Sequence, residues 1–239
     1  MTKVLTQHDT EALLQASRRV DWRFLLPDPE LGRVGYAGPA RGALVDALRK
    51  FSASLTVYLE DKGPSLRSPQ VRMRPSQFGS IRTTGETRPG SPLEGEAAGS
   101  GQFDVVVAIE PAITTLEQAV QGLRPDGWLY VEAHGPALRG PLRIARDYAA
   151  ALRRLGMADV EAHWHWPNFE SCAEIVPLDE KAALLSVFER HRSEPSARLK
   201  STFGRWLLRS GLLARVVPHF SIVARRTGAP AVVLGGVSM

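Results

Sequence analysis

The sequence predicts an α/β protein with a doubly wound, mostly parallel sheet and a helical insertion before the last strand. Two observations predict this class. Short runs of apolar residues alternate with stretches in which apolar residues recur at helical spacing. One run, Phe103–Ile109, is of the continuous apolar kind that a strand buried on both faces needs. Right-handed connections between such strands place helices on both faces of the sheet.

The elements follow in order along residues 33–227, which we interpret as one domain. Residues 1–32 form an N-terminal helix, expected at 9–19, and an entry segment that ends in proline-rich turns. Strands are expected at 33–38, 54–59, 103–109, 128–132, 158–164 and 218–225, and helices at 43–51, 114–123, 141–155, 179–191 and 197–213. We expect the last strand at an edge of the sheet.

Three segments depart from this alternation. Residues 62–102 are rich in Gly, Pro and Ser and predict an irregular insertion, with short strands at most at 68–74 and 78–81. Residues 167–217 form a helical lid or acceptor region, and residues 228–239 form a small apolar tail.

Composition excludes several classes of protein. With 44% hydrophobic and 23% charged residues, the 239-residue chain is expected to fold. A single cysteine, Cys172, excludes an intramolecular disulfide framework and cysteine-based metal centres. The net charge of +5 is spread along the chain, so nucleic acid is an unlikely ligand. The absence of a secretory signal and of a long apolar run predicts a cytoplasmic protein, and the Arg-, Ala- and Gly-rich composition suggests a bacterial one.

A glycine turn after the first strand marks a candidate ligand site. Gly38 and Gly42 allow the backbone to approach a ligand, and the helix that follows points free N–H groups at polar atoms. Glu60, or its neighbour Asp61, ends the second strand, where an acid can accept both hydroxyls of a ribose. Ligands of open parallel sheets bind outside the carboxyl ends of the strands, where these residues are expected.

This order of turn and acid, followed by Phe103–Ile109 and by Leu123–Val131, resembles the class I S-adenosylmethionine-dependent methyltransferases, which have a Rossmann-like fold. The resemblance extends from about Arg33 to Arg225. It implies that Gly38, Ala40, Gly42, Glu60, Asp61 and Ile109 contact S-adenosylmethionine. It also implies that Glu110 lies beside the position of methyl transfer, as a general base or a polar contact. A helix-capping role for Glu110 is an alternative.

The sequence also departs from that family. Tyr36 stands where the family has an acid, Ala40 stands where it has the middle glycine, and Arg41 adds a cation. These departures leave open a second hypothesis, a catalytically inactive methyltransferase-like domain that serves as a binding or assembly module. A nucleotide-dependent enzyme on a similar sheet, such as a dehydrogenase, is a third.

The stretch around residues 162–170 is the most distinctive. His163 and His165 are two apart, so on a strand both point to one face, with Trp164 and Trp166 on the other. We interpret these aromatic side chains as packing. A metal site completed by Glu170 or His134 is an alternative that we do not favour, so we predict no metal site. Alternatively, Trp166, Asn168 and Phe169 line the pocket of a small or lipophilic acceptor, with His165 as the acceptor's base.

A basic, amphipathic stretch at 197–215 is expected to cover the core as a lid helix or to contact an anionic membrane surface. Cys172 is not expected to be a nucleophile, because the sequence implies no Cys–His–acid arrangement around it.

Overall fold

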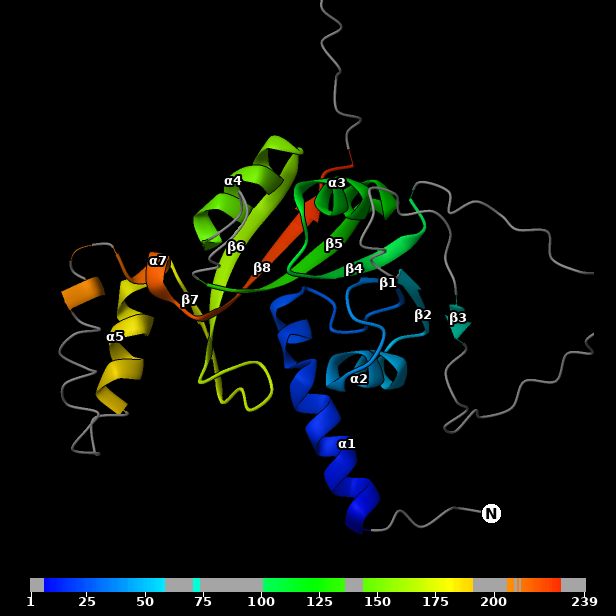
Figure 1. Ribbon diagram of the computed structural model, residues 1–239, viewed down its shortest axis with the longest axis horizontal. Coiled ribbons are helices and arrows are strands. Elements are labelled where there is room, and N and C mark those ends of the chain that lie inside the picture. The colour runs from blue at the N-terminus through cyan, green and yellow to red at the C-terminus, as the bar shows by residue number, and fades with distance from the viewer. Residues whose placement is uncertain are drawn as a thin grey trace, which may run out of the picture.

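The computed structural model describes residues 7–58, 71–73, 101–135, 144–190, 206–208, 210 and 212–228. Its centre is an eight-stranded sheet in the order β3-β2-β1-β4-β5-β8-β6-β7, flanked by helices (Figure 1). Strands β1, β2, β4, β5 and β6 run in one direction, whereas β3, β7 and β8 run in the opposite one. The predicted doubly wound α/β class is confirmed.

The strands are β1 (Arg33–Ala37), β2 (Ser54–Tyr58), β3 (Val71–Met73), β4 (Phe103–Ile109), β5 (Leu123–His134), β6 (Met157–Trp166), β7 (Glu174–Pro177) and β8 (His219–Arg226). The helices are α1 (Gln7–Arg19), α2 (Ala43–Phe51), α3 (Ile113–Gly122), α4 (Ala145–Arg154), α5 (Lys181–Arg190) and the short α7 (Leu213–Val216), with a 3-10 turn, η1 (Asp21–Leu25).

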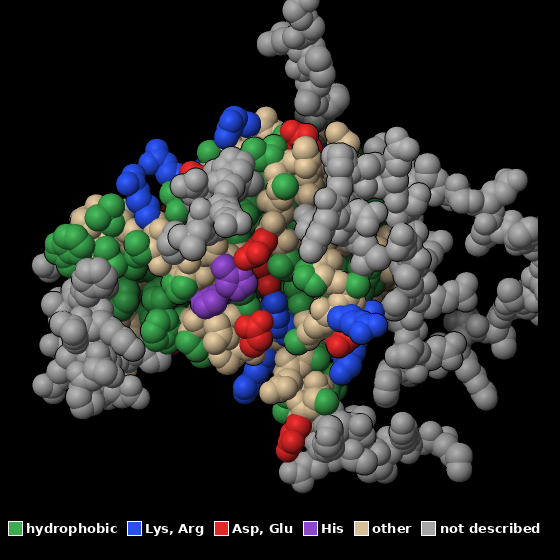
Figure 2. All heavy atoms as spheres, viewed as in Figure 1, with side chains coloured by type: hydrophobic (Ala, Val, Ile, Leu, Met, Phe, Trp, Pro, Cys, Tyr) green, Lys and Arg blue, Asp and Glu red, His purple; other side chains and the backbone are tan. Residues whose placement is uncertain are grey.

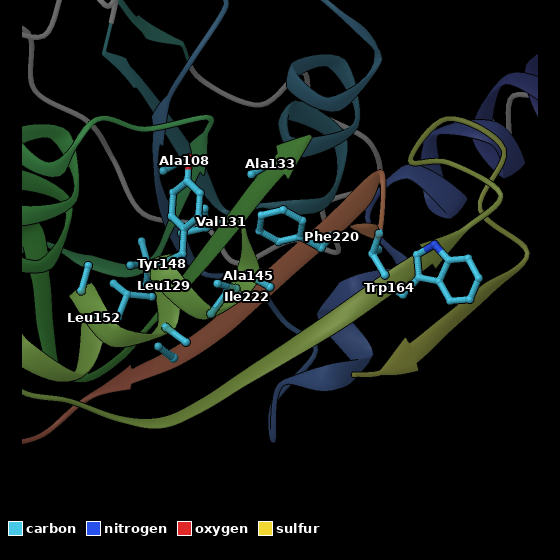
Figure 3. Packing of buried hydrophobic residues seen from close by; sticks show 14 of the residues in the cluster. Ala108, Leu129, Val131, Ala133, Ala145, Tyr148, Leu152, Trp164, Phe220 and Ile222 are labelled. Atoms are coloured by element: carbon cyan, nitrogen blue, oxygen red, sulfur yellow. The ribbon is translucent and has the colours of Figure 1, made fainter. Parts of the chain in front are cut away.

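Two apolar cores lie on opposite faces of the sheet, because successive side chains of a strand alternate between its faces. Helices α3 and α4 cover one face, where the rings of Tyr148 and Phe220 meet edge to face at 5.8 Å (Figure 3). Helix α2 and η1 cover the other face. There Trp22 of η1 stacks on Tyr130 of β5, with ring centroids 3.8 Å apart. The residues after α1 are thereby fixed to the centre of the sheet.

The order of the last strands differs from the expectation. The final strand, β8, is not at an edge: it lies between β5 and β6 and is antiparallel to both. The edge is β7, which pairs with β6 as a hairpin and which the sequence did not predict. In the interior, β8 is buried on both faces, from Phe220 to Ala224. Its continuous apolar sequence is typical of a central strand.

Strand β5 begins at Leu123, five residues before the strand expected at 128–132. Asp126 adopts a left-handed conformation there (φ 59°), and Gly127 lies close to the carbonyl oxygens of Arg124 and Asp104. Helices α1 to α5 lie at the expected places, within a few residues at their ends. Most of the helix expected at 197–213 falls outside the described residues.

Gly135 closes the contact between the end of β5 and the start of β8, and its replacement by alanine is expected to destabilise the protein. A Cβ there would lie 2.7 Å from the carbonyl oxygen of Val217 and 3.1 Å from the Phe220 ring. Because backbone must move to relieve this, we expect Gly135→Ala to lower the free energy of unfolding by about 1–3 kcal/mol in urea denaturation. Gly228→Ala is the control, since a Cβ there meets atoms only at 3.4 Å or more. Equal stabilities of the two variants would contradict the expectation.

Candidate functional site

The carboxyl ends of β1, β4, β5 and β6 lie side by side with the start of β8. This border of the sheet, which runs across the strand ends, is the edge described below. Strand pairing places Ala37 beside Ala108, Ile109 beside Glu132, and His134 beside His219. The backbone of Glu110 continues this edge by donating a hydrogen bond to the Glu132 carbonyl oxygen. In open α/β sheets ligands bind outside this edge. The candidate site is therefore built here.

The turn from β1 into α2 is open to solvent. Residues 39–43 are exposed, and Gly42 adopts φ 137°, where an added Cβ would meet nothing within 4 Å. Gly42 stands at the N-cap position of α2 and has no side chain with which to cap the helix. The first N–H groups of α2 are thus presented to a polar ligand atom at the positive end of the helix dipole.

Gly38 and Tyr36 form the buried floor of this turn. A Cβ on Gly38 would lie 2.9 Å from Ile109 Cγ1 and 2.9 Å from Tyr36 Oη. Gly38 is therefore required by packing between β1 and β4. Burial is the main reason why the pKa of Tyr36 is raised to about 12, and the Glu132 carboxylate raises it further. At the position where the resembling family has an acid, the chain carries a neutral phenol.

An exposed pair of ionisable side chains, Glu110 and His134, lies next to this floor. Glu110 follows Ile109 and adopts a left-handed conformation (φ 46°), which L-residues other than glycine seldom adopt. Its Oε1 lies 2.7 Å from Nδ1 of His134, and the two side chains are 56% and 53% exposed. A carboxylate that holds one ring nitrogen of a histidine leaves the other nitrogen free for chemistry.

Beyond His134 the edge is lined by aromatic rings. Phe169 is buried, and His134 meets its ring edge to face at 5.6 Å. His219 lies 5.0 Å from His134 and 5.7 Å from Phe169, between ring centroids. Figure 2 shows histidine side chains beside acidic ones in the middle of this face. Of the residues predicted to bind the acceptor, Phe169 lies in this cluster.

Behind the rings, a buried ion pair ties α1 to β5. Both terminal guanidinium nitrogens of Arg19 donate to the Glu132 carboxylate at 2.5 Å, and the side chains are 9% and 3% exposed. Tyr130 donates its hydroxyl hydrogen to the same carboxylate at 3.0 Å. The Arg19 guanidinium also lies over the Phe169 ring, 5.6 Å from its centroid. The sequence did not single out this network, because Arg19 precedes Glu132 by 113 residues.

His163 and His165 lie on one face of β6, as predicted, with Trp164 packed on the other. Both histidines are buried, however. The Nε2 atom of His165 lies 2.8 Å from Ser221 Oγ, and its Nδ1 lies 3.5 Å from Cys172 Sγ. Burial is the main cause that lowers the pKa of His165 to about 3 and that of His163 to about 4. Both nitrogens of His165 are engaged in the interior, so it does not face the exposed edge as a base would.

Cys172 and His165 form a contact that the sequence did not imply. Burial raises the pKa of the Cys172 thiol, and the thiol donates to the Glu174 carbonyl oxygen at 3.3 Å. A protonated thiol is a weak nucleophile. We therefore interpret the Cys172–His165 contact as packing around β7.

The other predicted site residues are more scattered. Asn168 accepts hydrogen bonds from the backbone and the hydroxyl of Ser171, which fixes the local turn. Trp166 meets Trp164 edge to face, with ring centroids 5.0 Å apart. Ala40 is exposed in the open turn. Glu60 and Asp61 lie outside the described residues, as does most of 197–215.

Two further properties concern metals and membranes. In the ranges given above, no three His, Cys, Asp or Glu side chains gather as metal ligands. No helix within those same ranges is long and apolar enough to cross a membrane. Trp206, in the segment expected to contact a membrane surface, is 56% exposed.

The chain is similar to solved structures of S-adenosylmethionine-dependent methyltransferases, at low identity. Phosphoethanolamine N-methyltransferase 2 from Haemonchus contortus is 13% identical, with a TM-score of 0.43 over 93% of this chain. The chain spans 58% of the length of that enzyme. A methyltransferase from Archaeoglobus fulgidus is 14% identical (TM-score 0.44), over 89% of this chain and 94% of the other. A possible histamine N-methyltransferase from Thermotoga maritima is 12% identical (TM-score 0.42), over 91% and 89%. No protein-family model and no curated protein sequence matches the chain.

Proposed function

We propose that the protein binds S-adenosylmethionine at the open turn after β1 and transfers its methyl group to a small-molecule acceptor at the edge formed by β4, β5 and β8. One observation carries the proposal. The uncapped start of α2 and the exposed Glu110–His134 pair lie at the same sheet edge, on either side of Ile109. The sequence resemblance described above points to the same ligand.

The chemistry of the turn suits the polar end of this cofactor. The free N–H groups at the start of α2 and the exposed side chain of Arg41 would hold a carboxylate. Gly38 and Ile109 would form the floor beneath it. When bound, S-adenosylmethionine supplies an electrophilic methyl group carried on a positively charged sulfur. Glu110, which is exposed next to this floor, offers a negative charge toward it.

The contribution of the chain's own residues is then to hold two reactants in line. The turn would fix the donor, and the His219 ring, supported by the buried Phe169 ring, would fix the acceptor. Orientation of this kind can supply a large part of the rate of a two-substrate reaction. The buried Arg19–Glu132 pair would keep both halves of the edge in place from below.

A binding or assembly module without catalysis is the second candidate. It is favoured by one observation, the neutral and buried phenol of Tyr36 at the position of the missing acid. Mass spectrometry of the denatured protein separates the two candidates in a first step. Co-purified S-adenosylmethionine or S-adenosylhomocysteine would favour the enzyme.

Ala40→Glu is expected to weaken S-adenosylhomocysteine binding at least tenfold, about 1.4 kcal/mol. Ala40 is exposed, so the fold should persist, and the added carboxylate would repel the ligand's own carboxylate at the turn. Calorimetric titration of wild-type protein and variant measures the effect. Ala53→Glu, at an exposed position beyond the far end of α2, is the matched control. An Ala40→Glu protein that binds as tightly as the control would place the ligand elsewhere.

A further inference from the structure

We propose that His134 is the general base of the reaction, that Glu110 positions it, and that the acceptor group is a phenolic hydroxyl. The inference rests on the proposed function and specifies the chemical class of its acceptor. It is carried by the geometry of one exposed cluster at the end of β5 and the start of β8.

The Glu110–His134 contact determines which nitrogen of His134 is available. Glu110 Oε1 lies 2.7 Å from Nδ1, so in the neutral ring Nδ1–H donates to the carboxylate. The other nitrogen, Nε2, then carries a lone pair and no hydrogen. Among the described residues Nε2 has no hydrogen-bond partner, and the side chain is 53% exposed. An acceptor can reach this nitrogen from solvent.

The other side chains that could act as a base are buried or engaged in hydrogen bonds. His165 has both ring nitrogens engaged, and His163 is buried on the same strand. The Nδ1 atom of His219 is buried with no hydrogen-bond partner in the described part of the chain. The Cys172 thiol keeps its proton on sulfur and donates a hydrogen bond to the Glu174 carbonyl oxygen. Of these groups, His134 alone combines exposure with a carboxylate that orients it.

The acceptor class follows from proton affinity and from the walls of the cluster. A phenol has a pKa near 10 and an imidazole near 6.5, so an imidazole can take the phenolic proton while the oxygen attacks the methyl group. A neutral amine already presents a lone pair and does not need a base for its attack. The Phe169 and His219 rings lie edge to face with each other and with His134. The exposed His134 ring and the partly exposed His219 ring would contact a flat aromatic acceptor, and the buried Phe169 ring supports both from behind.

The phenolic O–H gives its proton to His134 Nε2 while the oxygen forms a bond to the methyl carbon. The bond between that carbon and sulfur breaks, and its electron pair stays on sulfur in the neutral thioether of S-adenosylhomocysteine. The products are the methyl ether and an imidazolium ion, which Glu110 stabilises until it releases its proton to water.

The first test measures the tautomer of His134 without any substrate. In ¹⁵N-labelled full-length protein at pH 8.5, long-range ¹H–¹⁵N spectra should show the hydrogen of His134 on Nδ1, with His134→Gln assigning the signal. Glu110→Ala should shift the population toward the Nε2–H form, and the exposed control Glu189→Ala should not. An Nε2–H tautomer in the wild-type protein would overturn the assignment of the base.

The second test measures methyl transfer from S-adenosylmethionine to catechol, with aniline as the matched amine. We expect transfer to catechol and a loss of at least about 100-fold in His134→Gln, the lower range for general-base catalysis. S-adenosylhomocysteine binding by the variant should remain within twofold of wild type. Cofactor binding without transfer to catechol, or equal rates for the variant, would overturn the inference alone. Failure to bind the cofactor would overturn the proposed function and leave the tautomer result standing.

Discussion

Replacing Arg19 with alanine is expected to lower the free energy of unfolding by about 3–5 kcal/mol. The Glu132 carboxylate is 3% exposed and takes both of its charged hydrogen bonds from Arg19. Without the guanidinium, the carboxylate would remain buried, and among the described residues its remaining hydrogen bond is the one from the Tyr130 hydroxyl. Urea denaturation at pH 7, followed by circular dichroism, measures the loss.

A double variant separates the buried charge from the lost packing. Arg19→Met with Glu132→Gln removes both charges and keeps an oxygen that accepts from Tyr130. We expect it to regain most of the stability lost in the single variant. Arg190→Ala serves as the control because its ion pair with Glu174 is exposed on the arginine side, where such pairs contribute about 0–1 kcal/mol. A cost for Arg19→Ala no greater than that of the control would show that the pair is not a buried one in solution.

Acidification from pH 7 to pH 5 is expected to lower the free energy of unfolding by roughly 4 kcal/mol through His163 and His165. Burial holds their pKa values at about 4 and about 3 in the folded protein, whereas the unfolded chain protonates both near 6.5. Below pH 6.5 the unfolded state therefore binds more protons, and stability falls as the pH falls. Each histidine lowers the free energy of unfolding by about 1.4 kcal/mol per pH unit over the 1.5 units between pH 6.5 and pH 5.

Substitution of the two histidines should reduce the loss of unfolding free energy between pH 7 and pH 5. His163→Leu removes one buried histidine that has no partner for Nδ1 in the described part of the structure, so it should roughly halve the drop. Adding His165→Gln should remove most of the remainder. The pKa of His219 is lowered as well, mainly by burial, and adds a smaller effect in the same direction. Equal unfolding free energies at pH 7 and pH 5 would contradict the burial of both rings.

The fold could be predicted from the sequence where local pattern and tertiary environment agree. The Phe103–Ile109 run became β4 with the expected bounds, because a buried parallel strand is apolar throughout. The strands that neighbour β8 could not be predicted from its local sequence pattern. A continuous apolar strand fits any interior position, and its insertion between β5 and β6 is decided by pairing across more than fifty residues. The hairpin strand β7 has only four residues and carries little periodicity.

The candidate site was predicted in part for the same reason. The turn at Gly38–Gly42 and the position of Ile109 and Glu110 follow from strand ends, which the sequence marks clearly. The choice of histidine does not follow from spacing. His134 ends β5 and His165 lies one residue before the end of β6. Ser221 and Cys172, which come from other parts of the chain, contact His165 in the interior. Arg19 and Glu132 meet only in the folded chain.

We expect the edge formed by β1 and β4 to bind S-adenosylmethionine despite Tyr36 and Ala40. Calorimetric titration of ligand-free, folded protein with S-adenosylhomocysteine, the stable product, measures this binding. We expect one site per chain with micromolar affinity, about 8 kcal/mol of binding free energy. No heat at millimolar ligand, for protein that shows a cooperative unfolding transition, would contradict this expectation and favour the module without catalysis.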